Sequence, residues 1–192
     1  MMVKSIMIVG VGGQGSLLAS KLMGNVLMDE GYDVKVSEVH GMAQRGGSVV
    51  TYVKYGEKVY SPVIEQGEAD LIMSFEKLEA ARWMPYLKQG GKIVVNDQQI
   101  SPMPVITGAA QYPQDIIQKM KDKGADVLAI DALKLAHEAG NAKAVNVVLI
   151  GVVSKFLDFP QEVWLKAIEK CVPAKFLELN KKAFALGRSV EF

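Results

Sequence analysis

Short apolar runs alternate with segments of helical periodicity along most of the chain. Residues 5–9 form an apolar run that stops at Gly10, which is typical of a buried parallel strand. After the glycine-rich stretch 10–15, apolar residues recur at helical spacing up to Gly31, a natural C-cap. Residues 33–39 then read as a second strand. Together these segments predict one βαβ unit.

The pattern after this unit departs from a simple alternation of strands and helices. Residues 48–55 are rich in β-branched side chains and predict a strand. Gly56 and Glu57 suit a tight turn that leads into residues 58–61. These two segments therefore predict a β-hairpin added to the sheet.

The second half of the chain returns to alternating strands and helices and ends in helices. The apolar runs predict strands at 70–75, 92–96 and 126–131. The helical periodicity predicts helices at 76–89 (ending at Gly90-Gly91), 114–123, 132–139, 143–157 and 161–187, the last interrupted near Pro173. Residues 97–113 contain three prolines, which predicts loop or edge structure.

This order of elements predicts a three-layer α/β fold, with a mainly parallel sheet, helices on both faces and the added β-hairpin. The chain has 192 residues and shows no internal repeat, low-complexity tract or strong linker, so we expect a single domain over residues 1–192. Ligands of such sheets gather at the carboxyl ends of the strands. We therefore expect the loops at 10–15 and 40–47 to be neighbours in space.

The composition narrows the classes of function. Lys and Arg number 22 against 21 for Asp and Glu, which argues against a general nucleic-acid binder and against an anionic membrane surface as partner. No apolar stretch approaches the roughly 20 residues of a membrane span, and the N-terminal run is too short for a signal peptide. The single cysteine, Cys171, cannot form an internal disulfide, so we expect a cytoplasmic protein.

The cysteine count also limits the redox chemistry of the chain. An iron–sulfur cluster normally takes four thiolates, so any such carrier must belong to another chain. We expect Cys171 to be a small buried hydrophobe on a helix. His137 has no second ligand at metal spacing, so no metal site is predicted. No Ser/His/Asp or Cys/His arrangement can be assembled, and no residue is assigned as catalytic.

A glycine motif follows the first predicted strand. Gly10, Gly12 and Gly15 fit G-x-G-x-x-G, with a helix directly after it. Such glycines let the backbone approach a phosphate, and the helix N-terminus supplies free N–H groups. The alternative is that they only allow a tight turn and close helix–sheet packing. A dinucleotide site would also need an acid at the end of the second strand, for which Glu38 is the candidate.

The second strand ends in a polar, glycine-rich segment at residues 38–47. Arg45 offers a planar fork for a carboxylate or phosphate, or for a contact with another subunit. His40 could carry a proton near neutral pH. The alternative for both is a surface loop whose side chains hold its own backbone.

The two motifs together resemble the gamma-type domain of the 2-oxoacid:ferredoxin oxidoreductases. The resemblance rests on residues 10–15 followed by Ala19, and on residues 38–48, which include the sequence HGMAQRGG. That motif is most similar to the one in the indolepyruvate-oxidising members of the family. Residues 70–72, Asn96-Asp97, Asn146 and Gly151 are similar too, so the likeness spans nearly the whole chain.

The resemblance implies that the chain is the small subunit of a larger complex and is inactive alone. It implies a larger partner subunit that carries thiamine diphosphate, Mg²⁺ and 4Fe-4S clusters. The complex would decarboxylate an aryl 2-oxoacid, transfer the acyl group to coenzyme A and pass electrons to ferredoxin. The candidate cofactor-binding residues are Gly10, Gly12, Gly13, Gln14, Gly15, Glu38, His40, Gln44, Arg45 and Gly46.

Other functions stay open at this point. The chain could be the gamma subunit of an oxidoreductase for pyruvate or another 2-oxoacid, which would have the same fold. A stand-alone NAD-linked dehydrogenase is suggested by the glycine motif, but it lacks a convincing proton-transfer pair. A non-catalytic interaction module would have partners without thiamine or cluster motifs. The glycine loop could contact a cofactor, coenzyme A or only the partner subunit.

Overall fold

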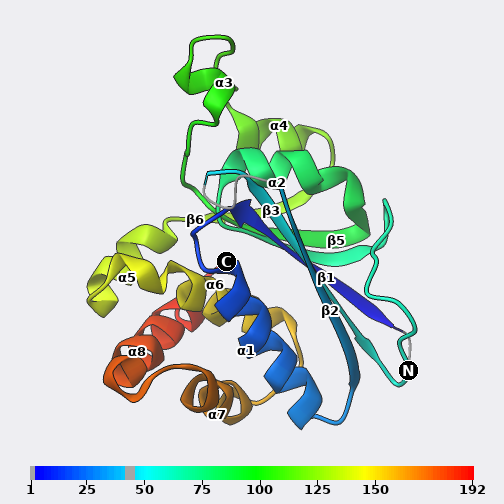
Figure 1. Ribbon diagram of the computed structural model, residues 1–192, viewed down its shortest axis with the longest axis vertical. Helices are drawn as coiled ribbons and strands as arrows, with labels where there is room; N and C mark the ends of the chain where they lie inside the picture. Colours follow the sequence, from blue (N-terminus) through cyan, green and yellow to red (C-terminus); the bar gives the residue numbers. More distant parts are fainter. Residues whose placement is uncertain (1–2, 42–45) are drawn as a thin grey trace.

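One mixed sheet of six strands organises the part of the chain that the structure describes, residues 3–41 and 46–192 of a computed structural model (Figure 1). The sheet order is β2-β3-β1-β4-β5-β6. The strands are β1 (Lys4–Val11), β2 (Asp33–His40), β3 (Ser48–Gly56), β4 (Ala69–Ser74), β5 (Leu87–Asn96) and β6 (Asp126–Ile130). Strands β1, β4, β5 and β6 pair in parallel, and β3 is antiparallel to both its neighbours. The prediction of a mainly parallel sheet is confirmed.

Helices cover both faces of the sheet, as predicted. The helices are α1 (Ser16–Asp29), α2 (Lys77–Trp83), α3 (Met103–Ile106), α4 (Ile116–Asp122), α5 (Ala132–Ala139), α6 (Val145–Val153), α7 (Gln161–Cys171) and α8 (Leu177–Arg188). Helices α1 and α5 to α8 pack against one face, and α2 and α4 against the other (Figure 1). Within the described ranges, no helix is both long and apolar enough to cross a membrane.

Strand β1 is buried on both faces, which explains its continuous apolar run. Successive side chains of a strand point to opposite faces. Ile6 and Ile8 accordingly belong to the core under α1 and α6, while Met7 and Val9 belong to the core under α2 and α4. All four are at most 1% exposed. The strand carries the glycine loop at its carboxyl end and holds it against two cores at once.

The predicted hairpin of residues 48–55 with 58–61 is wrong. Residues 58–61 form no strand, because β3 already pairs with β1 on one side and with β2 on the other. The N–H of Val59 instead donates to the Asp33 carboxylate at 2.8 Å, which holds the segment as a connection. The added hairpin exists, but it consists of β2 and β3. The predicted βαβ unit is therefore split, with β3 lying between its two parallel strands.

The predicted helix at 76–89 is too long. Helix α2 ends at Trp83, and a single 3-10 turn at Met84–Tyr86 follows. Pro85 lacks the N–H that would continue the helix. Gly90 and Gly91 do not end a helix but lie inside β5. A Cβ at Gly91 would lie 2.9 Å from the carbonyl oxygen of Ala69, where the pairing of β4 and β5 shifts register.

The other predicted elements are confirmed to within a few residues. The predicted strands at 70–75, 92–96 and 126–131 appear as β4, part of β5 and β6. Helix α5 matches its predicted range, and the long C-terminal helix is divided into α7 and α8 by an extended backbone at Pro173. The proline-rich segment 97–113 is a loop that contains only the one-turn helix α3.

Helices α6 and α8 approach each other at two glycines. All nine residues of α6 are buried. A Cβ at Gly187 would overlap the carbonyl oxygen of Val148, and one at Gly151 would lie 3.0 Å from the Cα of Gly187. The two backbones are therefore in direct contact. This contact fixes the position of α6, whose first turn lies beside the glycine loop.

We expect Gly187→Ala to lower the free energy of unfolding by about 1–3 kcal/mol or more, because the added methyl group must displace backbone. Gly24→Ala is the matched control, since Gly24 is also helical but its Cβ would meet only Val36 Cγ2 at 3.9 Å. This control should be neutral or stabilise by about 0.5–1 kcal/mol. Urea denaturation measures both. Equal stabilities of the two variants would contradict the proposed backbone contact.

Candidate functional site

The two sequence motifs meet at the carboxyl edge of the sheet. The N–H of Gly12 donates to the carbonyl of Gly47 at 2.8 Å, and the N–H of Gly46 donates to the carbonyl of Gly12 at 3.4 Å. The pairing of β1 with β3 ends just there, at Val11 opposite Ser48. The prediction that the two loops are neighbours is confirmed. Gln44 and Arg45 lie outside the described residues.

Gln14 closes the glycine loop from within. Its side-chain Oε1 accepts the N–H of Val11 at 2.7 Å, and its Nε2 donates to the carbonyl of Phe75 at 3.2 Å. Gly10 is buried beneath it, where a Cβ would lie 2.9 Å from the Gln14 Oε1 and 3.0 Å from the Phe75 Cβ. Of the predicted binding residues, Gly10 and Gln14 thus shape the loop.

Asn146 holds the other end of the same loop. Its Nδ2 donates to the carbonyl of Gly15 at 3.3 Å, and its Oδ1 accepts the N–H of Val147 at 2.9 Å. Gly15 adopts a φ of +90°, and a Cβ there would lie 2.6 Å from the Asn146 Nδ2. Only glycine fits this position. Asn146 was not among the predicted site residues, although a lone amide in the apolar helix Val145–Val153 is a signal that could have found it.

The glycine loop borders two cavities. One, of about 430 Å³, opens between the loop and the end of β2, and its walls are Gly12, Gly13, Gly15, Ser16, Leu17, Glu38, His40 and Val49. The other, of about 610 Å³, lies on the far side of the loop, and its walls include Gly13, Gln14, Gly15, Gln98, Ile100, Lys143 and Asn146. A Cβ at Gly13 would meet no atom within 4 Å, so this backbone is open to a ligand.

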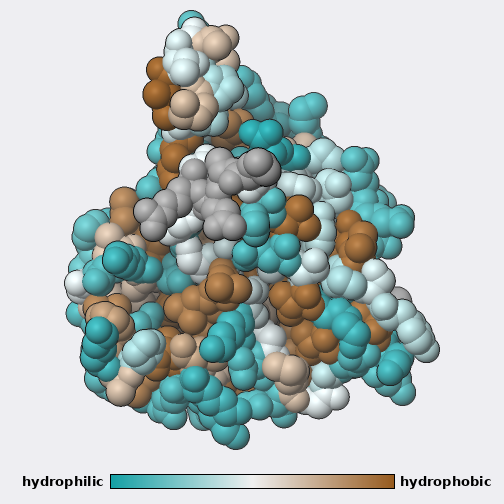
Figure 2. Space-filling view, viewed as in Figure 1, coloured by the Kyte–Doolittle hydropathy of each residue, from teal (hydrophilic) through white to brown (hydrophobic). Residues whose placement is uncertain are grey.

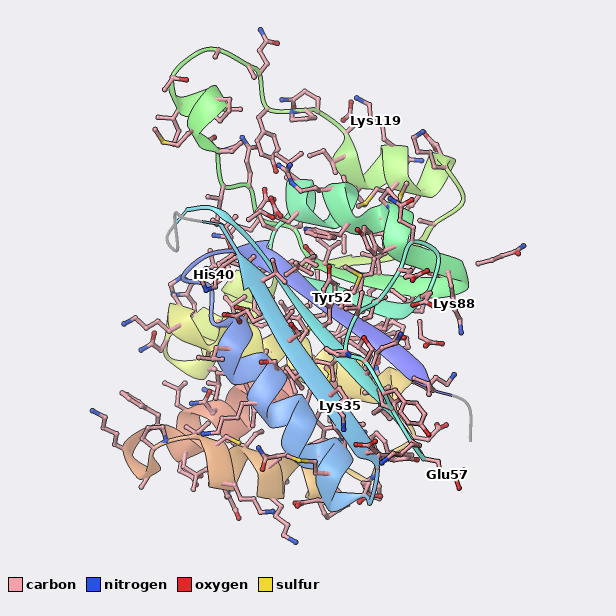
Figure 3. The ribbon with its side chains drawn as sticks, turned by 45° about the vertical axis from the view of Figure 1, so that its right-hand side comes forward. Lys35, His40, Tyr52, Glu57, Lys88 and Lys119 are labelled. Carbon is pink, nitrogen blue, oxygen red and sulfur yellow. The ribbon has the colours of Figure 1, made fainter. Side chains whose placement is uncertain are left out.

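Hydroxyl and carboxyl groups line the first cavity. Glu38 accepts hydrogen bonds from Ser16 Oγ at 3.4 Å and from Thr51 Oγ1 at 3.2 Å. His40 is exposed, with its Nδ1 3.2 Å from the carbonyl oxygen of Gly41. Figure 3 shows His40 and Lys35 toward opposite ends of β2, with His40 at the carboxyl edge. The predicted Glu38 and His40 are therefore brought beside the glycine loop.

Two buried carboxylates support this edge of the sheet. Glu76 is 1% exposed. Its carboxylate accepts a hydrogen bond from the N–H of Glu79 at 2.9 Å and another from the hydroxyl of Tyr112. Glu79 is 5% exposed and accepts a hydrogen bond from Ser48, the first residue of β3. It also accepts from Arg82 Nε at 3.2 Å. Helix α2 thus holds the strand on which the second loop ends.

The remaining sequence candidates lie elsewhere. His137 is exposed on α5. Cys171 is half-buried at the end of α7, where the Asn25 Nδ2 lies 3.4 Å from its Sγ and burial raises the pKa of the thiol. Among the described residues, no three His, Cys, Asp or Glu side chains are grouped so as to hold a metal ion.

Comparison with known proteins identifies the family. The model of the pyruvate ferredoxin/flavodoxin oxidoreductase family matches residues 5–190. The chain belongs to this family. The indolepyruvate oxidoreductase subunit IorB of Thermococcus kodakarensis is 47% identical over 95% of this chain and 93% of the relative. Its counterpart from Pyrococcus horikoshii is 45% identical over the same shares.

Solved structures of the family share the fold. The keto/oxoacid ferredoxin oxidoreductase gamma subunit from Geobacter sulfurreducens has a TM-score of 0.71 and 23% identity over 96% of this chain and 95% of that one. A 2-oxoglutarate:ferredoxin oxidoreductase from Magnetococcus marinus, solved with 2-oxoglutarate, coenzyme A and succinyl-CoA, has a TM-score of 0.74 and 16% identity. The match covers 98% of this chain but 31% of that longer chain.

We expect Gln14→Ala to lower the free energy of unfolding by about 1–3 kcal/mol, because the Val11 N–H and the Phe75 carbonyl lose a partner. Gln99→Ala, at an exposed glutamine, is the control and should change stability by less than about 0.5 kcal/mol. Thermal and urea denaturation measure both. Equal effects of the two variants would mean that the Gln14 contacts add nothing to the loop.

Stability at high pH should depend on Tyr112. Burial and the hydrogen bond to Glu76 raise the pKa of this phenol above its ordinary value of 10.0. Above about pH 10 the unfolded chain therefore releases a proton that the folded chain keeps, and the free energy of unfolding falls as pH rises. Tyr112→Phe should weaken this fall, and Tyr60→Phe, at a tyrosine 89% exposed, should not. Urea denaturation between pH 9 and 11 (about one unit either side of the ordinary value) tests the difference, and parallel curves would refute it.

Proposed function

We propose that this chain is the small subunit of an indolepyruvate:ferredoxin oxidoreductase. The complex would oxidatively decarboxylate aryl 2-oxoacids, transfer the acyl group to coenzyme A and reduce ferredoxin. The proposal is carried by the similarity to subunits named for indolepyruvate, at 47% identity over 95% of the chain. Relatives named as pyruvate/ketoisovalerate gamma subunits, such as that of Thermococcus litoralis, are only 24% identical. We infer that residues 1–192 act as one gamma-type domain in this complex.

We propose that the thiamine diphosphate, Mg²⁺ and 4Fe-4S clusters of the reaction belong to the larger partner subunit. The chain has one cysteine, and a 4Fe-4S cluster normally takes four thiolates. Thiamine diphosphate with its Mg²⁺ would likewise be held by the partner, as the family resemblance of residues 10–15 and 38–48 implies. Electrons would reach ferredoxin through the complex. A cytoplasmic location suits a protein with a lone, half-buried thiol.

We propose that the glycine loop and the end of β2 bind coenzyme A, with its phosphate groups at the glycine loop. Gly13 leaves open backbone at the N-terminus of α1, where free N–H groups and the helix dipole favour an anion. Arg45, which the sequence predicts to bind an anion, would add a bidentate contact to a phosphate. A Magnetococcus marinus enzyme that contains the same fold was solved with coenzyme A bound, which supports coenzyme A as the ligand. Gly10 and Gln14 would act on this site by shaping the loop.

A stand-alone NAD-linked dehydrogenase has less support than the oxidoreductase subunit. The ribose acid of a dinucleotide site accepts hydrogen bonds from ribose hydroxyls. Glu38 accepts from Ser16 and Thr51 through Oε2, which leaves Oε1 open to such a hydroxyl. The preference for the oxidoreductase subunit therefore rests on the similarity to the indolepyruvate oxidoreductase subunits.

The test is activity of the complex assembled by co-expression with the larger subunit. We expect coenzyme A-dependent reduction of ferredoxin with indolepyruvate, and much slower reduction with pyruvate. Gly13→Asp should raise the KM for coenzyme A about tenfold or more, because a carboxylate beside the phosphates is repelled. The KM for indolepyruvate should not change.

Gly67→Asp is the matched control for this experiment. Gly67 also has a left-handed φ (+79°, against +103° at Gly13) and open space around its Cβ, but it lies in a turn away from the site. This variant should leave both KM values unchanged. A preference of the wild-type complex for pyruvate over indolepyruvate would favour the alternative function, the gamma subunit of a pyruvate oxidoreductase. An unchanged KM for coenzyme A in Gly13→Asp would refute the phosphate site alone.

A further inference from the structure

A neutral, exposed segment projects from the carboxyl edge of the sheet. We call residues 98–114 the arm; it lies between β5 and α4, and α3 forms its tip (Figure 1). The arm contains no Asp, Glu, Lys or Arg, although charged residues make up 22% of the chain. Surface segments of a monomer usually carry charge. The composition of the arm instead matches the centre of a protein–protein interface, where charged residues are depleted.

Two large apolar side chains stand out on the tip of the arm. Met103 and Ile106 are both 65% exposed, and their spacing of three residues on the helical turn puts them on the same side. Figure 2 shows brown, hydrophobic atoms on this projection, on the same face of the molecule as α1. The tip thus offers a compact pair of apolar side chains to a partner.

The tip is folded before any partner arrives. The N–H of Val105 donates to the carbonyl of Pro102 at 2.9 Å, and the N–H of Thr107 donates to the carbonyl of Met103 at 2.9 Å. Pro102 and Pro104 fix two further backbone angles. A preformed tip loses little conformational entropy on binding. The arm therefore suits permanent docking rather than a segment that must fold on its partner.

One buried carboxylate fastens both ends of the arm. Glu76 Oε1 accepts the N–H of Ile100 at 3.2 Å and also the hydroxyl of Tyr112. The base of the arm is continuous with the candidate site, because Gln98 and Ile100 line the larger cavity beside the glycine loop. A partner that grips the tip would thus be placed over this cavity.

Resting on the proposed function, we infer that the arm docks Met103 and Ile106 into an uncharged apolar pocket of the larger oxidoreductase subunit. A transient electron carrier is recognised mainly through charge, which the arm lacks, whereas permanent interfaces are more hydrophobic. In the Magnetococcus marinus enzyme the same fold occupies 31% of a longer chain, so further protein is available there to cover it.

The test uses the larger subunit with an affinity tag, co-expressed with this chain. The variant Met103→Glu/Ile106→Glu places two carboxylates on the tip and should reduce the co-purified chain about tenfold or more. The control Tyr60→Glu/Val63→Glu adds the same charge at apolar residues 89% and 54% exposed in the connection from β3 to β4. It should co-purify like the wild type. Thermal unfolding of each free chain verifies that both variants fold.

The outcomes separate the two proposals. Loss of binding by the arm variant alone supports the inference. Equal binding by both variants, or equal loss, overturns it and leaves the proposed function intact. A wild-type chain that fails to co-purify with the larger subunit overturns the proposed function as well. Self-association of the free chain that only the arm variant abolishes would assign the tip to a second copy, and would also overturn the inference.

Discussion

The candidate site depends on the antiparallel strand β3 that lies between β1 and β2. Because β3 begins where β1 ends, the residues that lead directly into it, Gly46 and Gly47, must pass beside the glycine loop. The hydrogen bonds of Gly12 to both Gly46 and Gly47 follow from that path. An ordinary βαβ unit would have paired β1 with β2 and left the second loop without this contact. The inserted strand thus makes one site from two motifs that are distant in sequence.

The apolar pattern predicted most of the fold because it records burial, and burial on two faces is what distinguishes β1 from an edge strand. It failed where pairing decided the structure. Residues 58–61 have strand-like side chains, but no free edge of β3 was left for them. The helical periodicity continues through Pro85 and overstates the length of helix α2, and Gly90 and Gly91 are typical of helix ends as well as of close strand approach.

The site was predictable only in its local parts. The glycine motif, Glu38 and His40 could be placed because each follows a recognisable strand. The long-range partners Asn146, Glu76 and Tyr112 could not, since no spacing rule connects Gly15 with an amide on α6 or Glu76 with Tyr112. A polar residue inside an otherwise apolar helix marks such a position in sequence, but it does not name the group that it contacts.

The shared anchor at Glu76 also has a consequence for how this protein can change over evolution. When both ends of a loop are held by one buried group, the loop can change without moving the elements that flank it. Lengthening such a loop costs only a little closure entropy. Residues at the tip near Gly108 can therefore be inserted, deleted or exchanged while β5, β6 and the glycine loop keep their places. The arm is thus a part of the fold that can change in sequence and length while the glycine loop at its base keeps its structure.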